Sequence, residues 1–155
     1  MGTNELLSIK QLSVKLQNKT VLLDTSLTLD FGDILGLVGP SGCGKTTLLN
    51  TIAGFNRLNN GEININSGLS TRDYFRVNKD VITITPSIYV APEHRNIGMI
   101  FQDYALFPHL SVEKNVCFGI NNLAKSEQKS RVSDLLHLLK LTDLGARYPH
   151  QLSGG

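Results

Sequence analysis

Alternating apolar and polar positions dominate the first third of the chain. Residues 6–16 and 25–32 follow this two-residue period, and Asn18 with Lys19 separates the two stretches. The pattern is typical of half-buried strands joined by a turn. We therefore expect an N-terminal antiparallel β subdomain.

Three apolar stretches then depart from simple alternation. Residues 33–39 form a nearly continuous apolar run, which predicts a strand buried on both faces of a parallel sheet. Residues 45–53 have apolar side chains at 48, 49, 52 and 53, a helical spacing that ends at Gly54. Residues 97–101 predict a second short buried strand.

The middle of the chain is rich in Asn, Ser, Thr and Ile. Residues 61–68 and 80–90 have the composition of strands, and a polar loop at about 71–80 joins them. We interpret residues 61–97 as a surface β excursion, and the sequence leaves its strand pairing open.

Helical patterns follow in the last third. Pro108, together with Ser111 and Glu113, predicts a turn and a helix start. Residues 126–141 begin with a cap-like Ser-Glu pair and predict a helix with one broad apolar face. That face comprises Val132, Leu135, Leu136, Leu138 and Leu139. The order of elements indicates an α/β domain with a helical insert.

Composition narrows the class of protein. The chain has 155 residues, 41% apolar content and a formal net charge of +2, without a long basic run, so we expect a folded domain and no nucleic-acid partner. Neither an export leader nor a stretch long enough to cross a bilayer is evident, which predicts a protein that is neither exported nor membrane-spanning by itself. Cys43 and Cys117 fit no paired metal spacing and are interpreted as reduced thiols.

One motif carries specific chemistry. The residues are Gly39, Pro40, Ser41, Gly42, Cys43, Gly44, Lys45 and Thr46, and they match G-x-x-x-x-G-K-[ST] between a predicted strand and a predicted helix. Glycines let the loop curl so that backbone N–H groups and the helix N-terminus cradle phosphates. Lys45 is expected to reach the β- and γ-phosphates of a nucleotide, and the Thr46 hydroxyl to ligate Mg²⁺.

This phosphate loop alone leaves kinases, GTPases, helicases and transporters open, and two later motifs narrow the choice. Residues 98–119 read "GMIFQDYALFPHLSVEKNVCFG", and residues 147–155 read "RYPHQLSGG". With the loop, they make almost the whole chain resemble the ATP-binding subunits of ABC transporters. The resemblance implies an ABC-type P-loop NTPase of α/β class. Its parts are an N-terminal antiparallel β subdomain, a partial parallel sheet and a helical subdomain.

The resemblance also assigns roles to individual residues. Gln102 matches the glutamine of the Q-loop, which contacts Mg²⁺ and the attacking water. Ser153, Gly154 and Gly155 match the signature, which binds the γ-phosphate of the nucleotide held by the other subunit of a head-to-tail dimer. Thr47 joins the phosphate-loop residues in nucleotide binding. ATP and Mg²⁺ are therefore the expected cofactors, and Lys45 and Gln102 the expected catalytic residues.

The sequence says less about which residues contact the adenine base and which substrate is transported. Family members commonly stack adenine on an aromatic residue about two dozen positions before the phosphate loop, where Leu16 stands here. We expect apolar contact from Leu16, shared with Val21. The motifs are most similar to those of ferric-iron importers, with sulfate, polyamine and sugar importers as alternatives. A non-transport ABC module also stays open. The four histidines are scattered and predict no iron site; they are His94, His109, His137 and His150.

Family members also have an apolar strand ending in Asp-Glu after the signature, the Walker B element, and then a switch histidine. Neither occurs in these residues, so we expect a partial nucleotide-binding domain lacking the Walker B half and truncated within the signature. Its core spans about 1–101, with the Q-loop and helical subdomain at about 102–155. This chain alone is expected to bind nucleotide weakly, to hydrolyse none and to aggregate.

The resemblance implies partners and a place in the cell. The expected partners are a second ATP-binding subunit, transmembrane permease subunits and, indirectly, a periplasmic or lipid-anchored substrate-binding protein. The expected location is peripheral, on the cytoplasmic face of the inner membrane.

Overall fold

The computed structural model describes residues 4–66 and 81–152. It divides into two compact units, Met1–Met99 and Ile100–Gly155. The polar loop expected at about 71–80 lies outside the described residues.

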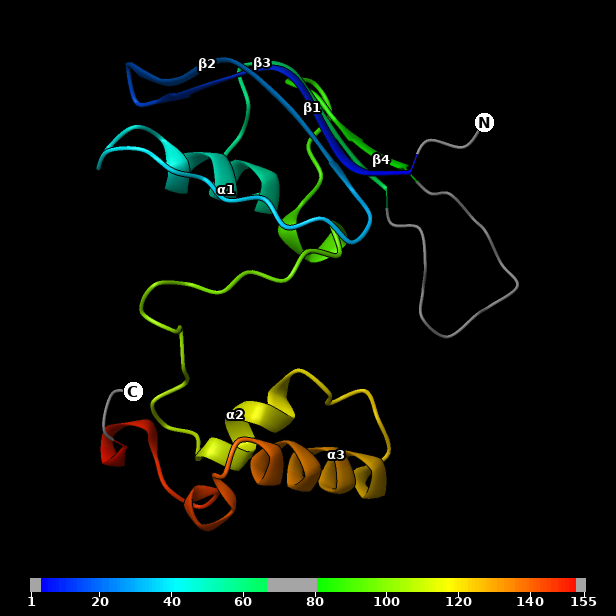
Figure 1. Ribbon diagram of the computed structural model, residues 1–155, viewed down its shortest axis with the longest axis vertical. Helices are drawn as coiled ribbons and strands as arrows, with labels where there is room; N and C mark the ends of the chain where they lie inside the picture. Colours follow the sequence, from blue (N-terminus) through cyan, green and yellow to red (C-terminus); the bar gives the residue numbers. More distant parts are fainter. Residues whose placement is uncertain (1–3, 67–80, 153–155) are drawn as a thin grey trace. The chain divides into compact units, whose positions relative to one another are not determined.

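An antiparallel sheet forms the first unit's framework (Figure 1). Its strands are β1 (Glu5–Leu16), β2 (Lys19–Asp30), β3 (Asn60–Asn66) and β4 (Val81–Ile84), in the order β2-β1-β3-β4. The predicted N-terminal hairpin is confirmed, with Ile9 opposite Leu27 on one side and Ile63 on the other. The structure also decides the pairing that the sequence left open, because β3 pairs with both β1 and β4.

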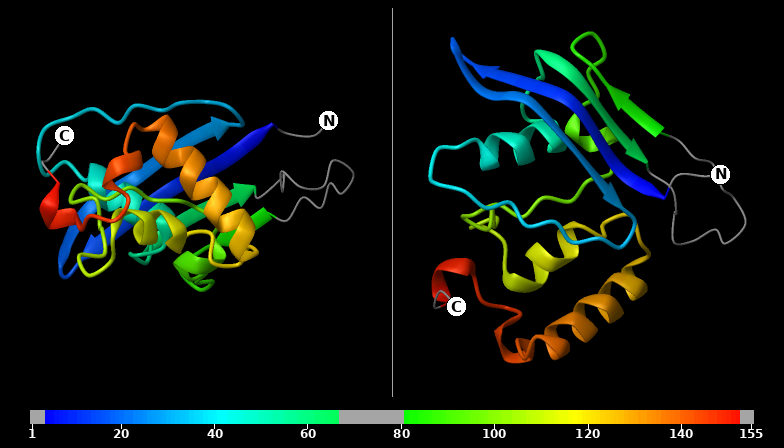
Figure 2. Two further views of the ribbon diagram at one scale, coloured as in Figure 1. Left: turned by 90° about the horizontal axis from the view of Figure 1, so that it is seen from below. Right: turned by 45° about the horizontal axis from the view of Figure 1, so that its top comes forward.

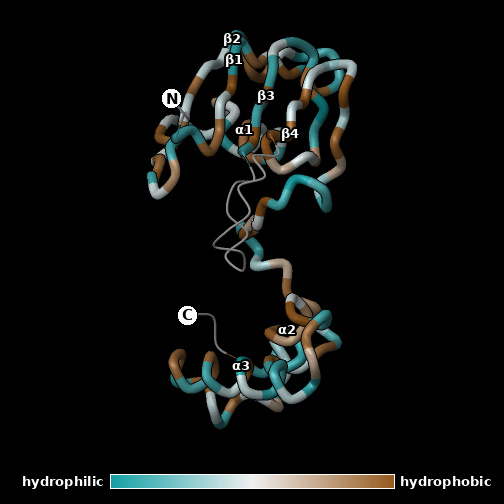
Figure 3. Tube along the Cα trace, turned by 90° about the vertical axis from the view of Figure 1, so that its right-hand side faces the viewer, coloured by the Kyte–Doolittle hydropathy of each residue, from teal (hydrophilic) through white to brown (hydrophobic). Residues whose placement is uncertain are grey.

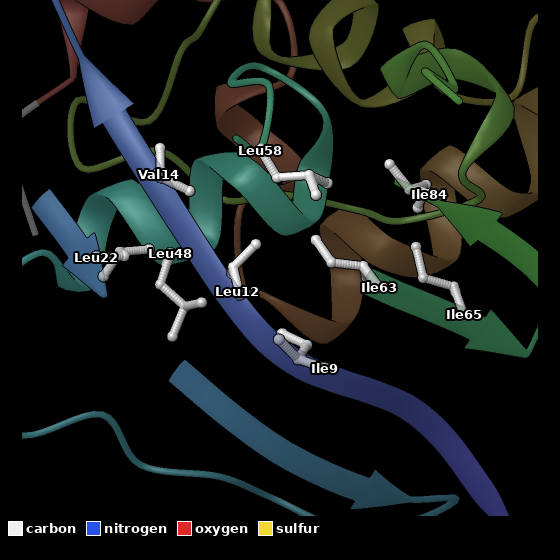
Figure 4. Packing of buried hydrophobic residues seen from close by; sticks show 9 residues of the cluster. All are labelled: Ile9, Leu12, Val14, Leu22, Leu48, Leu58, Ile63, Ile65 and Ile84. Atoms are coloured by element: carbon white, nitrogen blue, oxygen red, sulfur yellow. The ribbon is translucent and has the colours of Figure 1, made fainter. Parts of the chain in front are cut away.

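Alternation along the strands places one set of side chains in a common core. Hydrophobic and hydrophilic residues succeed one another along the trace of the sheet (Figure 3). The core cluster joins all four strands to helix α1 through Leu48, and Figure 4 shows its side chains. Its members are Ile9, Leu12, Val14, Leu22, Leu48, Leu58, Ile63, Ile65 and Ile84. Each such side chain contributes on the order of 1.5–3 kcal/mol on burial.

Helix α1 (Lys45–Ala53) lies against one face of this sheet (Figure 2). It has the predicted bounds and ends at Gly54, whose φ of 101° lets the backbone N–H bond back to the carbonyls of Asn50 and Thr51. Leu48 enters the core, while Leu49 is about half exposed. The prediction of this helix is confirmed, because glycine at both ends defines it locally.

The two predicted parallel strands are wrong for the described structure. Residues 33–39 and 97–101 are not strands, and every strand pair among the described residues is antiparallel. Ile34, Val38 and Ile100 are 100%, 94% and 91% exposed. A buried parallel strand needs hydrogen-bonded neighbours on its edges and cover on both faces, and an apolar run cannot supply these by itself.

Two helices pack together in the second unit. Helix α2 (Val112–Phe118) starts where predicted, with Ser111 as its N-cap, and the Ser111 side chain accepts a hydrogen bond from the Lys114 N–H. Helix α3 (Lys125–Leu138) occupies nearly the predicted range. Short 3-10 helices at Thr142–Leu144 and Pro149–Gln151 follow, and a third, Pro92–His94, belongs to the first unit.

Details of α3 differ from the prediction. Val132 and Leu136 are buried, whereas Leu135, Leu138 and Leu139 are exposed. The five residues cover too wide an arc for one packing partner, so only the part facing the rest of the unit is covered. The N-cap is Ala124 rather than the Ser-Glu pair, and it makes no side-chain cap bond.

Candidate functional site

The phosphate loop passes directly into α1 through Gly44. Gly44 is buried, occupies the N-cap with a φ of 98°, and accepts the first helical hydrogen bond from the Leu48 N–H at 2.8 Å. An ideal Cβ on Gly44 would lie 2.8 Å from Leu22 Cδ2 and 3.1 Å from the Val21 carbonyl oxygen. Only glycine combines this left-handed backbone with so close an approach to β2.

Lys45 curls back over the loop. Its ammonium Nζ donates to the carbonyl oxygens of Gly39 at 2.8 Å and Pro40 at 2.7 Å, and it lies 3.6 Å from Cys43 Sγ. The first N–H groups of any helix lack intrahelical acceptors and carry partial positive charge. Lys45 and the N-terminus of α1 therefore concentrate positive charge at one exposed position, which suits a phosphate group.

The hydroxyl-bearing residues of the loop region separate into two roles. Thr46 is exposed on the first turn of α1, where its hydroxyl can reach a ligand. The Thr47 carbonyl instead accepts a bond from the buried Thr51 hydroxyl at 2.7 Å, which belongs to the helix itself. Ser41 and Gly42 lie exposed in the turn before the helix, as a ligand-facing loop requires.

The tip of the β1–β2 hairpin brings an apolar surface to the loop. Val21 packs beside Gly44. Leu16 is 40% exposed and lies two residues beyond the buried Val14, so the two side chains share one face of the sheet. The structure therefore joins Val21 to the phosphate loop and places Leu16 at the end of the same hairpin.

Gln102 belongs to the second unit. It lies exposed at the start of a turn in which two consecutive non-glycine residues, Tyr104 and Ala105, have φ values of 61° and 46°. Left-handed backbone at residues with a Cβ costs roughly 1–2 kcal/mol each. The surrounding structure must hold such a turn in place.

Asn115 of α2 holds the segment that follows this turn. Its Oδ1 accepts from the Phe107 N–H at 2.9 Å, and its Nδ2 lies 3.0–3.1 Å from the carbonyls of Phe107, Leu110 and Ser111. One amide side chain thus links the start of α2 to the loop after Gln102.

The signature residues Ser153, Gly154 and Gly155 lie outside the described residues. The segment before them is fastened to the start of α2, because the N–H groups of Val112 and Glu113 donate to the carbonyls of Arg147 and Gly145 at 2.8 and 2.9 Å. Gln151 caps the last described turn, with its Oε1 accepting from the Tyr148 N–H at 2.8 Å.

One buried charge, at the C-terminal end of α1, was not predicted from the sequence. Arg95 is 1% exposed, and its guanidinium bonds to backbone carbonyls at the C-terminal end of α1. Arginine is rarely buried, and periodicity does not reveal which one is. Among the described residues, no group of three or more His, Cys, Asp or Glu could hold a metal ion, and Cys43 and Cys117 form no disulfide.

A glycine-rich phosphate loop between an antiparallel sheet and a helix, followed by a helical unit, defines an ATP-binding cassette. The model of the ABC transporter family matches residues 22–155, and the chain belongs to that family.

Curated relatives agree with this membership. The Fe(3+) ions import ATP-binding protein FbpC 2 of Haemophilus influenzae is 41% identical over 100% of this chain and 40% of its own length. The spermidine/putrescine import ATP-binding protein PotA of Marinobacter nauticus is 42% identical over 97% of this chain and 36% of its own length. The chain thus spans about two fifths of the length of these relatives.

Solved structures confirm the ABC ATPase fold. The cassette MJ0796, a dimer in a post-hydrolysis state bound to ADP and Pi, matches with a TM-score of 0.70 at 23% identity, over 95% of this chain and 63% of that one. The cassette MJ1267 matches with a TM-score of 0.72 at 24% identity, over 98% and 60%. Among the residues that the structure describes, no helix is both long and apolar enough to cross a membrane.

Proposed function

We propose that this chain is the ATP-binding part of an energy-coupling subunit in an ABC import system. The observation that carries the proposal is the phosphate loop, where Lys45 and the N-terminus of α1 converge beside a glycine that no other residue can replace. Nucleotide phosphates are the ligands that such a cradle accommodates.

Each proposed role follows from the chemistry of the residue. The loop residues 39–47 bind the phosphates through the Lys45 ammonium and through their backbone N–H groups, which every one of them except Pro40 has. Thr46 and Gln102 supply neutral oxygen ligands, which fit Mg²⁺ when phosphate oxygens and water complete its octahedral shell. When bound, Mg²⁺ neutralises charge on the phosphates. Ser153, Gly154 and Gly155 contact the γ-phosphate held by a second copy of the subunit.

The proposal extends to partners and location. A head-to-tail homodimer would close over two nucleotides and drive transmembrane permease subunits, to which a periplasmic or lipid-anchored binding protein delivers cargo. The subunit would then be peripheral on the cytoplasmic face of the inner membrane. ATP hydrolysis in that assembly is the proposed activity.

Ferric iron is the proposed cargo, with polyamines as the second candidate. Relatives named for Fe(3+) and for spermidine/putrescine import are 41% and 42% identical to this chain, so identity alone does not separate them. A strain deleted for this subunit distinguishes the two. Loss of ⁵⁵Fe(3+) uptake with normal spermidine uptake supports iron, and the reverse result contradicts it.

Direct calorimetric titration tests the nucleotide site. The purified protein is expected to bind ATP and inorganic tripolyphosphate at one site per chain, because the cradle recognises phosphate groups. Absence of heat with either ligand, from protein shown to be folded by circular dichroism, contradicts the proposal.

Leu16 provides a prediction about the base. Leu16→Tyr is expected to raise ATP affinity by about 5- to 10-fold. Stacking a base on an aromatic ring is worth roughly 1–3 kcal/mol relative to alanine, and we expect the lower end of that range because leucine already gives apolar contact without stacking. Tripolyphosphate, which has no base, should bind as before. Calorimetry with both ligands measures the two effects.

Leu23→Tyr is the matched control. Leu23 is 77% exposed, and it follows the buried Leu22, so its side chain points away from the face that carries Leu16. It should leave ATP affinity unchanged. Equal gains in both variants, or none with Leu16→Tyr, would contradict the assignment of Leu16.

A further inference from the structure

Helix α1 is short, and both of its ends are held by other parts of the first unit. It has nine residues, of which Leu48, Thr51 and Ala53 are buried. Helices this short are marginal by themselves, so their position depends on tertiary contacts. The N-terminal end of α1 is fixed by the packing of Gly44 against Val21 and Leu22.

Arg95 fixes the opposite end. Its Nη1 donates to the carbonyl oxygens of Thr51 at 2.8 Å and Ile52 at 2.9 Å, and its Nε donates to the Val90 carbonyl at 2.8 Å. The last carbonyls of a helix lack intrahelical donors. One guanidinium therefore joins the C-terminal end of α1 to the segment at 90–95.

Tyr89 adds a second tie to the same helix end. Its hydroxyl donates to the Gly54 carbonyl at 3.0 Å, and its ring lies 5.8 Å from the Arg95 Cζ. An ideal Cβ on Gly54 would lie 2.8 Å from Arg95 Nε, so the helix end and the guanidinium are in close contact. Arg57 covers the same ring at 4.5 Å and is exposed.

Burying this charge has a physical cost. Burial lowers the pKa of the Arg95 guanidinium, and the neighbouring Tyr89 opposes part of that shift. No salt bridge to Arg95 occurs within residues 4–66 and 81–152, so backbone carbonyls and the negative end of the helix dipole provide its stabilisation. An apolar side chain could fill the same space without a charge, but it could not donate hydrogen bonds to both α1 and the 90–95 segment.

We propose that Arg95 is a positioning residue for the nucleotide site, acting through α1. The residue holds the C-terminal end of the helix while β2 holds the N-terminal end, and together they fix where Gly44, Lys45 and Thr46 point. This inference rests on the proposed phosphate-binding function of the loop. Supports of this kind matter because a binding group displaced by a fraction of an ångström loses much of its affinity.

The test measures phosphate affinity in Arg95→Met, which keeps the apolar stem and removes all donors. Both ATP and tripolyphosphate are expected to bind about 10-fold more weakly, by analogy with the 10- to 100-fold cost of losing a supporting residue at a metal site. Calorimetry is done well below the unfolding temperature of the variant. Equal weakening of both ligands locates the effect at the phosphate cradle.

Two control variants separate positioning from stability. Ile84→Val removes one methylene group from the core on β4, so it lowers the unfolding temperature while leaving the hydrogen bonds from Arg95 to α1 in place. Its affinity for both ligands should match the original protein. Arg57→Met removes the exposed guanidinium that lies over the Tyr89 ring and should also leave affinity unchanged.

Several results would overturn the positioning role of Arg95. Original affinity in folded Arg95→Met, or equal weakening in Ile84→Val, overturns the positioning role. If Arg95→Met does not fold, Arg95→Lys, which keeps the charge but loses the fork, must weaken tripolyphosphate binding by about 3-fold or more. An unchanged affinity there overturns the inference. Failure of the original protein to bind tripolyphosphate would instead overturn the proposed nucleotide site.

Discussion

Replacing Lys45 with alanine is expected to weaken ATP binding by about 100-fold. Hydrogen bonds from a charged donor contribute on the order of 1.5–3 kcal/mol, and about 2.7 kcal/mol corresponds to that factor. The Lys45 ammonium lies among the loop carbonyls at the positive end of α1, where it can exchange these acceptors for phosphate oxygens. Tripolyphosphate should lose as much affinity as ATP.

The control for this result is Lys10→Ala. Lys10 is exposed on β1 and pairs with Glu62 of β3, away from the loop. Both lysine variants should unfold within about 1 kcal/mol of the original protein, because exposed polar contacts contribute little to stability. ATP binding by Lys45→Ala equal to that by Lys10→Ala would show that the loop is not the phosphate site.

Gly44→Ala is expected to remove measurable ATP binding and to lower the free energy of unfolding by about 2–4 kcal/mol. Left-handed backbone with a Cβ costs about 1–2 kcal/mol, and displacing neighbouring atoms adds a similar amount. The added methyl group would meet both Leu22 and the Val21 carbonyl, so β2 and the start of α1 must separate. Urea unfolding and calorimetry measure the two losses.

Substitutions at two other glycines separate the two causes of this destabilisation, backbone strain and steric contact. Gly42 has a φ of 79° with open space around its ideal Cβ, so Gly42→Ala should show the backbone strain alone, about 1–2 kcal/mol. Gly36 has neither a strained φ nor a near neighbour, and Gly36→Ala should be nearly neutral. Equal destabilisation by all three substitutions would refute the contact between Gly44 and β2.

Elements with local boundary signals were predicted correctly. Helix α1 has Gly44 and Gly54 at its ends, and the β1–β2 hairpin combines alternation with a short turn. The start of α2 at Ser111 is set by a side chain bonding to the N–H of Lys114. In each case, the backbone N–H and C=O groups at the ends of the element bond to residues close in sequence, so the local sequence pattern indicates where the element begins or ends.

Elements that depend on distant neighbours were not predictable in the same way. The apolar runs at 33–39 and 97–101 fit buried strands, yet hydrogen-bonded strand partners are required to make them so. The pairing of β3 with β1 joins residues far apart in the chain, for example Leu7 with Ile65, which are 58 positions apart. Nothing in the strand composition specifies that neighbour.

In the candidate site, too, the features formed by consecutive residues were predictable and those formed by distant residues were not. The phosphate loop was identified from residues 39–46, because its glycines, lysine and threonine carry the chemistry in consecutive positions. The contact of Val21 with Gly44 and the burial of Arg95 under the end of α1 emerged only from the structure. Arg95 lies 43 and 44 positions from the carbonyls that it binds, and no local pattern encodes such a distance.

The sequence by itself determined the family of this protein and the proposed phosphate cradle, because the motifs of an ABC cassette and the loop with its lysine are consecutive residues. Motifs of this kind consist of consecutive residues, so they can be recognised without knowledge of the tertiary structure. The tertiary structure alone decided how the cradle is supported, since β2 packs against its glycine and Arg95 holds the far end of its helix. Those contacts arise where chain segments distant in sequence meet, and their energies exist only in the folded molecule.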